Sequence, residues 1–196
     1  MKKLNFIPYL FILIPFINSC NEAGNIKSSS DSDSLTIETI SIGNQTWMLK
    51  SINSSKFNNG DIIEEASTKD EFRKLGKDHK SACIIINDSI SNTSNTYYNW
   101  YAVNDPRGLA PNGWHIPSKD EIYVLVNELK KDEVGGIEKL KIILPWERWW
   151  TSSASAEHDA DATSFIIGIT KRHGVLLDFK NGSDKIKPFF VRCLKN

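Results

Sequence analysis

Residues Tyr98 to Glu121 read YNWYAVNDPRGLAPNGWHIPSKDE, a stretch in which Trp, Tyr, Gly and Pro are unusually dense for a globular segment. Its last residues form a capping box, with Ser118 at the N-cap of a helix and Glu121 three residues later. A helix is therefore predicted from Ser118 as far as Gly135-Gly136. Its apolar face would consist of Ile122, Leu125, Val126 and Leu129.

The stretch resembles the centre of a known bacterial family, the Fibrobacter succinogenes major paralogous (FISUMP) domain, whose pattern runs roughly YNWYAV, RGLCP and GWHxPSxxEW. The resemblance extends from about Ile37 to Lys195. Further matches are IGNQTWM at 42–48, Gly135-Gly136, WWTSS at 149–153 and VRCLK at 191–195. Two departures matter: Ala110 replaces the family's cysteine, and the family's Gly-rich segment is absent between Lys141 and Trp149.

The resemblance also implies a fold. The family's GWHxPSxxEW is similar to the GYRLPTEAEW of formylglycine-generating-type domains, and the VRC ending at 191–193 is similar to their GFRC. Those domains elaborate a C-type lectin-like core. The expected fold is therefore α+β and C-type lectin-like, with two main helices packed on antiparallel strands in a single domain, although a fold does not fix a function.

The pattern of the chain itself favours the same class. Leu35 to Ile42 and Gln45 to Lys50 are strand-like runs joined by Gly43-Asn44, a hairpin signal. Thr68 and Glu71 form a second capping box for a helix whose end fits Gly76. Ala82 to Ile86 is a further apolar run, and later strands are predicted at Trp149–Ser155, Thr163–Thr170, Val175–Phe179 and Phe189–Lys195.

The N-terminus has the organisation of an export signal. Two lysines precede an apolar run from Leu4 to Ile17, which is shorter than the ~20 residues of a membrane-spanning helix. Ile17-Asn18-Ser19-Cys20 resembles a lipobox, so residues 1–19 are predicted to be a lipoprotein signal peptide and Cys20 the lipidated residue. An ordinary signal peptide without lipidation is the alternative.

The residues after Cys20 change abruptly in composition. Positions 20–34 are rich in Ser, Asp, Asn and Gly and are predicted to be a flexible polar tether, which leaves 35–196 as one FISUMP domain. Two of the 24 basic residues lie in the leader, so 22 remain against 24 acidic ones. The chain has no basic patch that would indicate nucleic acid.

Two cysteines, Cys83 and Cys193, remain after the leader. Export to an oxidising compartment makes a disulfide between them plausible, and we expect it in protein from such a compartment. Because both cysteines lie in apolar runs, two buried thiols in neighbouring strands are the alternative.

Trp146 is the residue we select as a ligand-binding candidate. It lies in PWER, where the family's Gly-rich segment is missing, and a loop tryptophan beside charges can stack on a sugar ring or a protein partner. By contrast, the motif tryptophans are expected in the core: Trp100, Trp114, Trp149 and Trp150. His115, inside the motif, is expected to be a packed structural histidine rather than a general base.

Catalytic and metal-binding patterns are weak. The sequence has no G-x-S-x-G, H-E-x-x-H or P-loop motif, and a formylglycine-type oxidase would need a pair of reactive cysteines. The acidic loop Glu157 to Asp161 offers oxygen ligands for Ca²⁺, but its spacing is not that of an EF-hand. We predict no metal site, no cofactor and no enzymatic activity.

These observations favour a lipid-anchored protein of the cell envelope, expected in the outer membrane, on its periplasmic face or at the cell surface. The domain would be a noncatalytic binding module for polysaccharide or an envelope protein. A structural envelope component without a small ligand is the alternative, and an enzyme is the third class. A binding module predicts a groove with exposed aromatic rings, whereas an enzyme predicts a cleft with converging titratable groups.

Overall fold

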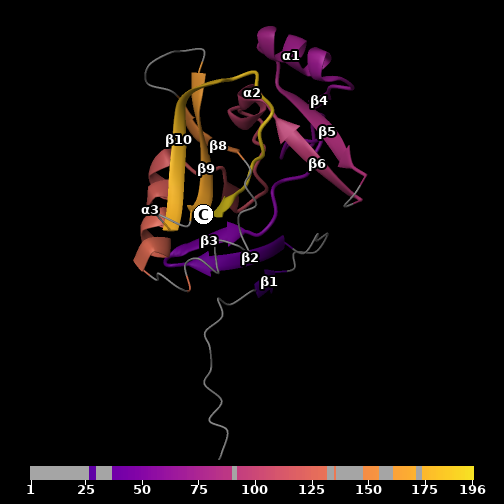
Figure 1. Ribbon diagram of the computed structural model, residues 1–196. Coiled ribbons are helices and arrows are strands. Elements are labelled where there is room, and N and C mark those ends of the chain that lie inside the picture. Colours follow the sequence, from indigo (N-terminus) through magenta and orange to yellow (C-terminus); the bar gives the residue numbers. More distant parts are fainter. Residues whose placement is uncertain are drawn as a thin grey trace, which may run out of the picture.

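The computed structural model describes residues 27–29, 37–89, 92–131, 135, 148–154, 161–170 and 174–196 (Figure 1). These residues form a single domain of mixed helix and sheet, with three helices and strands in three separate sheets. The α+β prediction is confirmed at this level. The sequence predicted α1 and α3, but it did not predict the short helix α2 between them.

The first sheet has five strands and brings the two ends of the domain together. Their order is β1 (Lys27–Ser29), β2 (Ile37–Ile42), β3 (Gln45–Met48), β11 (Leu194–Lys195) and β7 (Trp114–His115). Each neighbouring pair in this sheet is antiparallel. The C-terminal strand therefore lies between a strand from the start of the domain and a strand from the motif.

The predicted hairpin is confirmed in this sheet. Ile42 pairs with Gln45 across a two-residue turn, and Gly43 has a φ of +56°, a left-handed conformation that glycine adopts without strain. The strand β1 was not expected, because its three residues lie in the segment predicted to be a polar tether. They pair with β2 through backbone hydrogen bonds, which do not require apolar side chains.

The second sheet consists of β8 (Trp149–Ala154), β9 (Asp161–Thr170) and β10 (Gly174–Asp184), in the order β10-β9-β8. The helix α3 (Lys119–Lys131) lies beside β10 in Figure 1 and contacts β2, β8 and β10. Its predicted start is confirmed: the Ser118 N–H and hydroxyl both donate to Glu121 Oε2 at 2.8 Å. The four predicted apolar residues of α3 are all buried.

The third sheet has the order β4 (Glu64–Glu65), β5 (Ala82–Asp88), β6 (Thr93–Tyr98). The helix α1 (Lys69–Lys77) covers one of its faces, and α2 (Trp100–Val103) follows β6 directly. The strands β4 and β5 are parallel, so the expectation of antiparallel strands alone was wrong. Parallel pairing is possible here because α1 provides the crossover connection from β4 to β5.

Both ends of α1 refine the sequence prediction. The Thr68 hydroxyl accepts the Glu71 N–H at 3.1 Å, as a capping box requires, whereas the Glu71 carboxylate accepts the N–H of Ser67. Gly76 was expected at the helix end but lies inside the last turn. The left-handed residue beyond the helix is His79, with a φ of 56°.

The C-terminal segment is extended, but it is not the single strand predicted for Phe189–Lys195. Phe189 pairs with Tyr98 of β6, and Phe190 forms a bridge to Trp149 of β8. Only the last part of the segment joins the first sheet, as β11. Because the segment changes partners along its length, it connects all three sheets instead of belonging to one.

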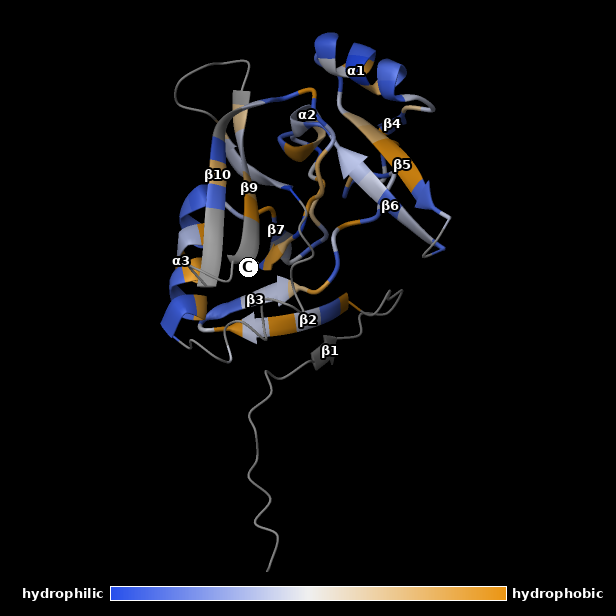
Figure 2. Ribbon diagram, in the orientation of Figure 1, coloured by the Kyte–Doolittle hydropathy of each residue, from blue (hydrophilic) through white to orange (hydrophobic). Residues whose placement is uncertain are grey.

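The core consists of three clusters of buried side chains. The largest includes three motif tryptophans and both cysteines, the second lies under α3, and the third lies under α1. All four motif tryptophans are at most 9% exposed, so the prediction that they build the core is confirmed. Figure 2 shows hydrophobic residues along β2 and β5 and mostly hydrophilic ones on α1.

Candidate functional site: a polar groove beside the C-terminal segment

A groove with a volume of about 500 Å³ lies where three distant segments meet. These segments are the loop 49–53 after β3, the first residues of β6, and the C-terminal segment before β11. The lining residues are Leu49, Lys50, Ser51, Ile52, Asn53, Thr93, Ser94, Asn95, Phe190 and Arg192. Most of them carry a hydroxyl, an amide or a positive charge.

Backbone hydrogen bonds fix the loop that forms one wall of the groove. Met48 donates its N–H to the Cys193 carbonyl at 3.1 Å, and Ile52 donates to the Val191 carbonyl at 2.7 Å. At the end of the loop, Ser54 donates its N–H to the Tyr98 hydroxyl, which in turn donates to the Ser54 carbonyl. The groove is therefore built on rigid contacts with the C-terminal segment and β6.

Asn53 connects the loop to β6. Its side-chain Oδ1 accepts a hydrogen bond from the Thr96 hydroxyl, and its Nδ2 donates to the Ser94 carbonyl at 3.4 Å. Ser94 donates its own hydroxyl to Asn87 Oδ1 at 2.6 Å. Asn95 of the same strand is half-buried and also lines the groove.

The charges that line the groove are positive. The Arg192 guanidinium is 3% exposed and stacks over the Trp149 ring, 4.5 Å from its centroid. Lys50 lies at the rim, where its ammonium group pairs with Glu38 at 2.9 Å. The lining residues include no carboxylate, thiol or imidazole. The groove can therefore offer hydrogen bonds and positive charge to a ligand.

One buried hydroxyl of the groove has no hydrogen-bond partner in the described part of the chain. It is the Oγ of Ser51, which lies in the loop between Lys50 and Ile52. Burying a hydroxyl without a partner costs free energy, about 1–3 kcal/mol by protein mutational data. A polar ligand or a water in the groove would remove this cost.

The motif histidine lies away from this groove and has a structural environment. His115 Nδ1 is 2.7 Å from Asn196 Oδ1, and its Nε2 is 2.9 Å from Glu121 Oε1. Burial alone would raise the pKa of Glu121, but hydrogen bonds from Ser118 and His115 outweigh it and lower that pKa. His115 thus joins the end of the chain to the first turn of α3, as expected for a structural histidine.

A second motif group, from the RGL sequence, is also structural. Arg107 Nη2 pairs with Asp105 Oδ2 at 2.8 Å, and the guanidinium lies 4.1 Å from the centroid of the Phe57 ring. The hydrogen bonds from Arg107 hold the pKa of the Asp105 carboxyl well below its usual range, although burial opposes this. A third charge, Asp61, is 3.4 Å from Arg107, so the group connects the loop after β3 to the motif.

The two core cysteines are free thiols in the structure, so it does not contain the disulfide predicted from the sequence. Cys83 lies on β5 and Cys193 precedes β11, and both are fully buried. Each packs in the largest apolar cluster, which also contains Tyr98. Both cysteines are thus buried apolar side chains, as in the alternative, but they do not lie in neighbouring strands, because Cys193 lies outside a strand.

Three predicted site features lie outside the described residues: the lipidation residue Cys20, the ligand candidate Trp146, and the acidic loop from 157 to 160. Within the described ranges no cluster of three or more His, Cys, Asp or Glu side chains could hold a metal ion. In the same ranges no helix has the length and apolar character needed to cross a membrane.

Sequence reasoning did not find the groove. Its residues come from three segments that are separated by about forty and about one hundred positions, and each segment contributes ordinary polar residues. One signal was available: Arg192 is a charged residue inside an apolar C-terminal run, which is unusual for a core strand.

Comparison with known proteins identifies one match. Residues 40–138 match the family model described as Fibrobacter succinogenes major domain (Fib_succ_major). No curated protein and no solved structure matches the chain. The matched range contains the Tyr98–Glu121 stretch and two of the three groove segments, while Phe190 and Arg192 lie beyond it.

Proposed function

This chain belongs to the Fibrobacter succinogenes major domain family, and from that membership we propose that it is a noncatalytic binding module of the bacterial cell envelope. The ligand would be polysaccharide, and the binding site would be the polar groove. The observation that carries the proposal is the lining of the groove, where amides and hydroxyls meet Arg192, buried in the wall, and Lys50, paired with Glu38 at the rim. Its volume of about 500 Å³ is in the range of ligand sites.

The chemistry of the groove favours sugars with hydroxyl or acidic substituents. Asn95 and Ser51 can exchange hydrogen bonds with hydroxyl groups, and Lys50 and Arg192 would attract uronate or similar anionic groups. Phe190 also lines the groove, but it is 8% exposed and its ring centroid lies 4.3 Å from that of Tyr97, so it offers a sugar little aromatic surface. Trp146 would add a second aromatic surface from the segment beyond α3.

The proposed location follows from the N-terminal sequence. Residues 1–19 would be removed, Cys20 would carry the lipid, and the polar residues that follow would hold the domain away from the bilayer. Two acyl chains anchor a protein stably where one does not. The membrane would be the outer membrane, with the domain on its periplasmic face or at the cell surface.

We also infer a C-type lectin-like architecture. The element order supports it, because the two longer helices α1 and α3 are followed by the antiparallel strands β8 to β10 and by an apolar C-terminal segment that contains Cys193. The pairing of the first and last parts of the domain, β3 with β11, is consistent with such a closed arrangement. This architecture carries no assignment of a sugar, which rests on the groove alone.

A glycan array tests the proposal. The soluble Cys20→Ser chain, which retains β1, should bind a subset of polysaccharides, and Asn95→Ala should weaken that binding about tenfold through loss of the amide hydrogen bonds. Asn127→Ala is the matched control, because this asparagine is exposed on α3 and does not line the groove. Its binding should equal that of the parent protein.

Two outcomes would overturn the assignment. Absence of glycan binding, together with stable co-purification of other envelope proteins, would favour the structural component. Equal losses in Asn95→Ala and Asn127→Ala would show that sugars bind elsewhere on the domain.

A further inference from the structure

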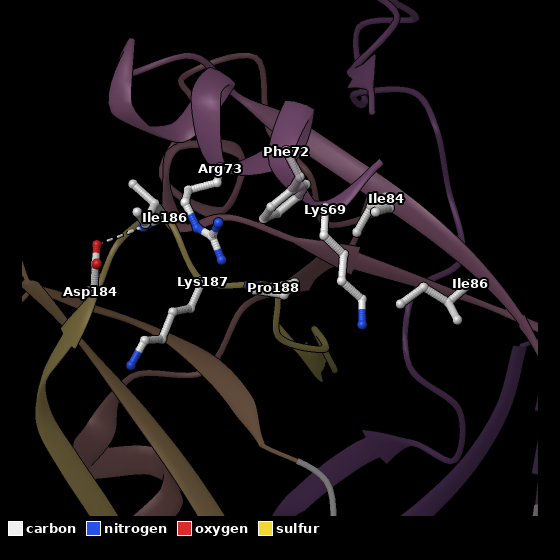
Figure 3. A pocket seen from close by; sticks show the side chains of 9 residues that line it. All are labelled: Lys69, Phe72, Arg73, Ile84, Ile86, Asp184, Ile186, Lys187 and Pro188. Carbon is white, nitrogen blue, oxygen red and sulfur yellow. Dashed lines mark hydrogen bonds between the residues drawn. The ribbon is translucent and has the colours of Figure 1, made fainter. Parts of the chain in front are cut away.

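A second hollow, of about 220 Å³, lies between α1, β5 and the turn that follows β10 (Figure 3). Its apolar lining consists of Phe72, Ile84, Ile86, Ile186 and Pro188. It shares no residue with the polar groove. An apolar hollow that remains open to solvent is unfavourable unless something covers it.

The walls of this hollow are held in place before any ligand binds. Asp184 Oδ1 accepts the N–H of Ile186 at 3.1 Å, which fixes the turn. The Lys185 carbonyl accepts the Trp100 N–H at 2.9 Å, so the turn is also attached to α2. On the other side, Gly76 of α1 lies in close contact with Ile186. A preformed hollow of this kind binds a ligand without an ordering cost.

The rim of the hollow is positively charged. In Figure 3, Lys69 and Arg73 lie among the apolar side chains and Lys187 extends from the turn after β10, while Asp184 is the one acidic residue of the lining. Arg73 pairs with Asp70 at 3.0 Å on the exposed surface of α1. Among the described residues neither Lys69 nor Lys187 takes part in an ion pair. A ligand that completes this site therefore needs an anionic group beside an apolar body.

We propose that this hollow binds a medium-chain carboxylate, with the hydrocarbon chain on the isoleucines and the carboxylate at the cationic rim that Lys69, Arg73 and Lys187 form. The size supports the proposal. At ~30 Å³ per water the hollow corresponds to about seven water molecules, which suits a short hydrocarbon chain and excludes an oligosaccharide or a folded partner. The site does not depend on the proposed polysaccharide groove, and either can fail without the other.

Octanoate at millimolar concentration, below micelle formation, is the probe. The full chain is used with Cys20→Ser, so that no lipid is attached and no detergent competes for the site. In a methyl NMR spectrum with labelled isoleucine, the signals of Ile84, Ile86 and Ile186 should shift on titration. Those of Ile62 and Ile85 should not, because neither residue lines the hollow.

The apolar contact has a matched pair of variants. Ile85 and Ile86 are neighbours on β5 with almost the same exposure, 37% and 38%, but they point to opposite faces of the strand. Ile86→Glu should abolish octanoate binding, since it places a negative charge in the hollow. Ile85→Glu should leave the affinity for octanoate unchanged. This variant is the control for folding, because it places a glutamate on the same strand outside the hollow.

The charge contribution is tested separately. Lys69→Gln and Lys187→Gln should each weaken octanoate binding by about two- to fivefold, as expected for exposed ion pairs. Lys77→Gln is the control on the same helix, because Lys77 does not line the hollow. Lengthening the acid should tighten binding by up to about fourfold per methylene until the hollow is full.

Three results would overturn the proposal. The first is the absence of shifts at Ile86 and Ile186 at millimolar octanoate. The second is equal binding of octanol and octanoate, which would show that the cations play no part. The third is equal loss in Ile85→Glu and Ile86→Glu, which would place the ligand elsewhere.

Discussion

Tyr98 and the two core cysteines show how single residues define the interior of this domain. Cys83 is the direct strand partner of Tyr98, and all three side chains lie in the same apolar cluster. Burial raises the pKa of the Cys83 thiol to about 11 and raises the pKa of the Cys193 thiol still further. Because the thiolate is the reactive form, both cysteines should be poor nucleophiles in the folded protein.

Thiol reactivity of the Cys20→Ser chain measures this directly. At pH 8 the folded protein should react with a thiol reagent at least ~100-fold more slowly than the unfolded protein, since protonation and burial act in the same direction. In denaturant, without a reductant, two thiols should be counted. A count of zero in aerobically purified material would show that the disulfide forms after all. Reactivity should rise with pH, because the folded thiols lose their protons only in strongly alkaline solution.

At the scale of elements, Gly76 determines how α1 meets the turn after β10. A Cβ at this position would lie 2.6 Å from the Cβ of Ile186, closer than real side chains approach. In an isolated helix, replacing glycine by alanine stabilises by up to about 1 kcal/mol. Here we expect the opposite sign: Gly76→Ala should lower the free energy of unfolding, because the helix or the turn must move apart.

The measurement is a denaturant titration of four proteins: the parent, Gly76→Ala, Ile186→Gly and the double variant. Ile186→Gly alone removes a partly buried side chain and should destabilise. In the double variant the two closest contacts of the new alanine, with Cβ and Cγ2 of Ile186, are absent, so the two losses should not add. Additive losses, or a stabilised Gly76→Ala protein, would contradict the close contact as the reason for this glycine.

Some helices and strands could be predicted from the sequence, and others could not. The helix starts at Ser118 and Thr68 were predictable because a capping box is a local signal of four residues. The buried face of α3 was predictable from the helical period. The C-terminal segment was not, because its residues pair with β6, β8 and β3 in turn, and no local pattern encodes a change of partner.

The groove was unpredictable for the same physical reason. Asn53, Asn95 and Arg192 line one groove because Met48 and Ile52 donate backbone hydrogen bonds to carbonyls of the C-terminal segment. The role of Gly76 was also misassigned, since glycine serves a helix end and a close contact equally well. The motif residues Trp100 and Trp114, in contrast, were correctly predicted to lie in the core.

At the scale of the whole molecule, the residues that build the core differ from the residues that complete the two hollows. The family motif and its tryptophans form the core, whereas both hollows are completed by residues after 183, beyond the family match. The segment 184–192 provides Lys187 and Pro188 to one hollow and Phe190 and Arg192 to the other. Variation in this one segment could therefore change ligand preference without disturbing the core.

The whole protein should also depend on one residue for its location. Cys20→Ser removes the thiol that would form the thioether to diacylglycerol, and the polar residues after it offer no apolar surface for the bilayer. We expect the variant to lose metabolic labelling by a palmitate analogue and to leave the membrane fraction. Ser19→Ala is the matched control, because it keeps a small residue before the cysteine and should retain both properties. Undiminished label in Cys20→Ser, normalised to the amount of protein, would refute the lipid anchor and leave an ordinary signal peptide as the interpretation of residues 1–19.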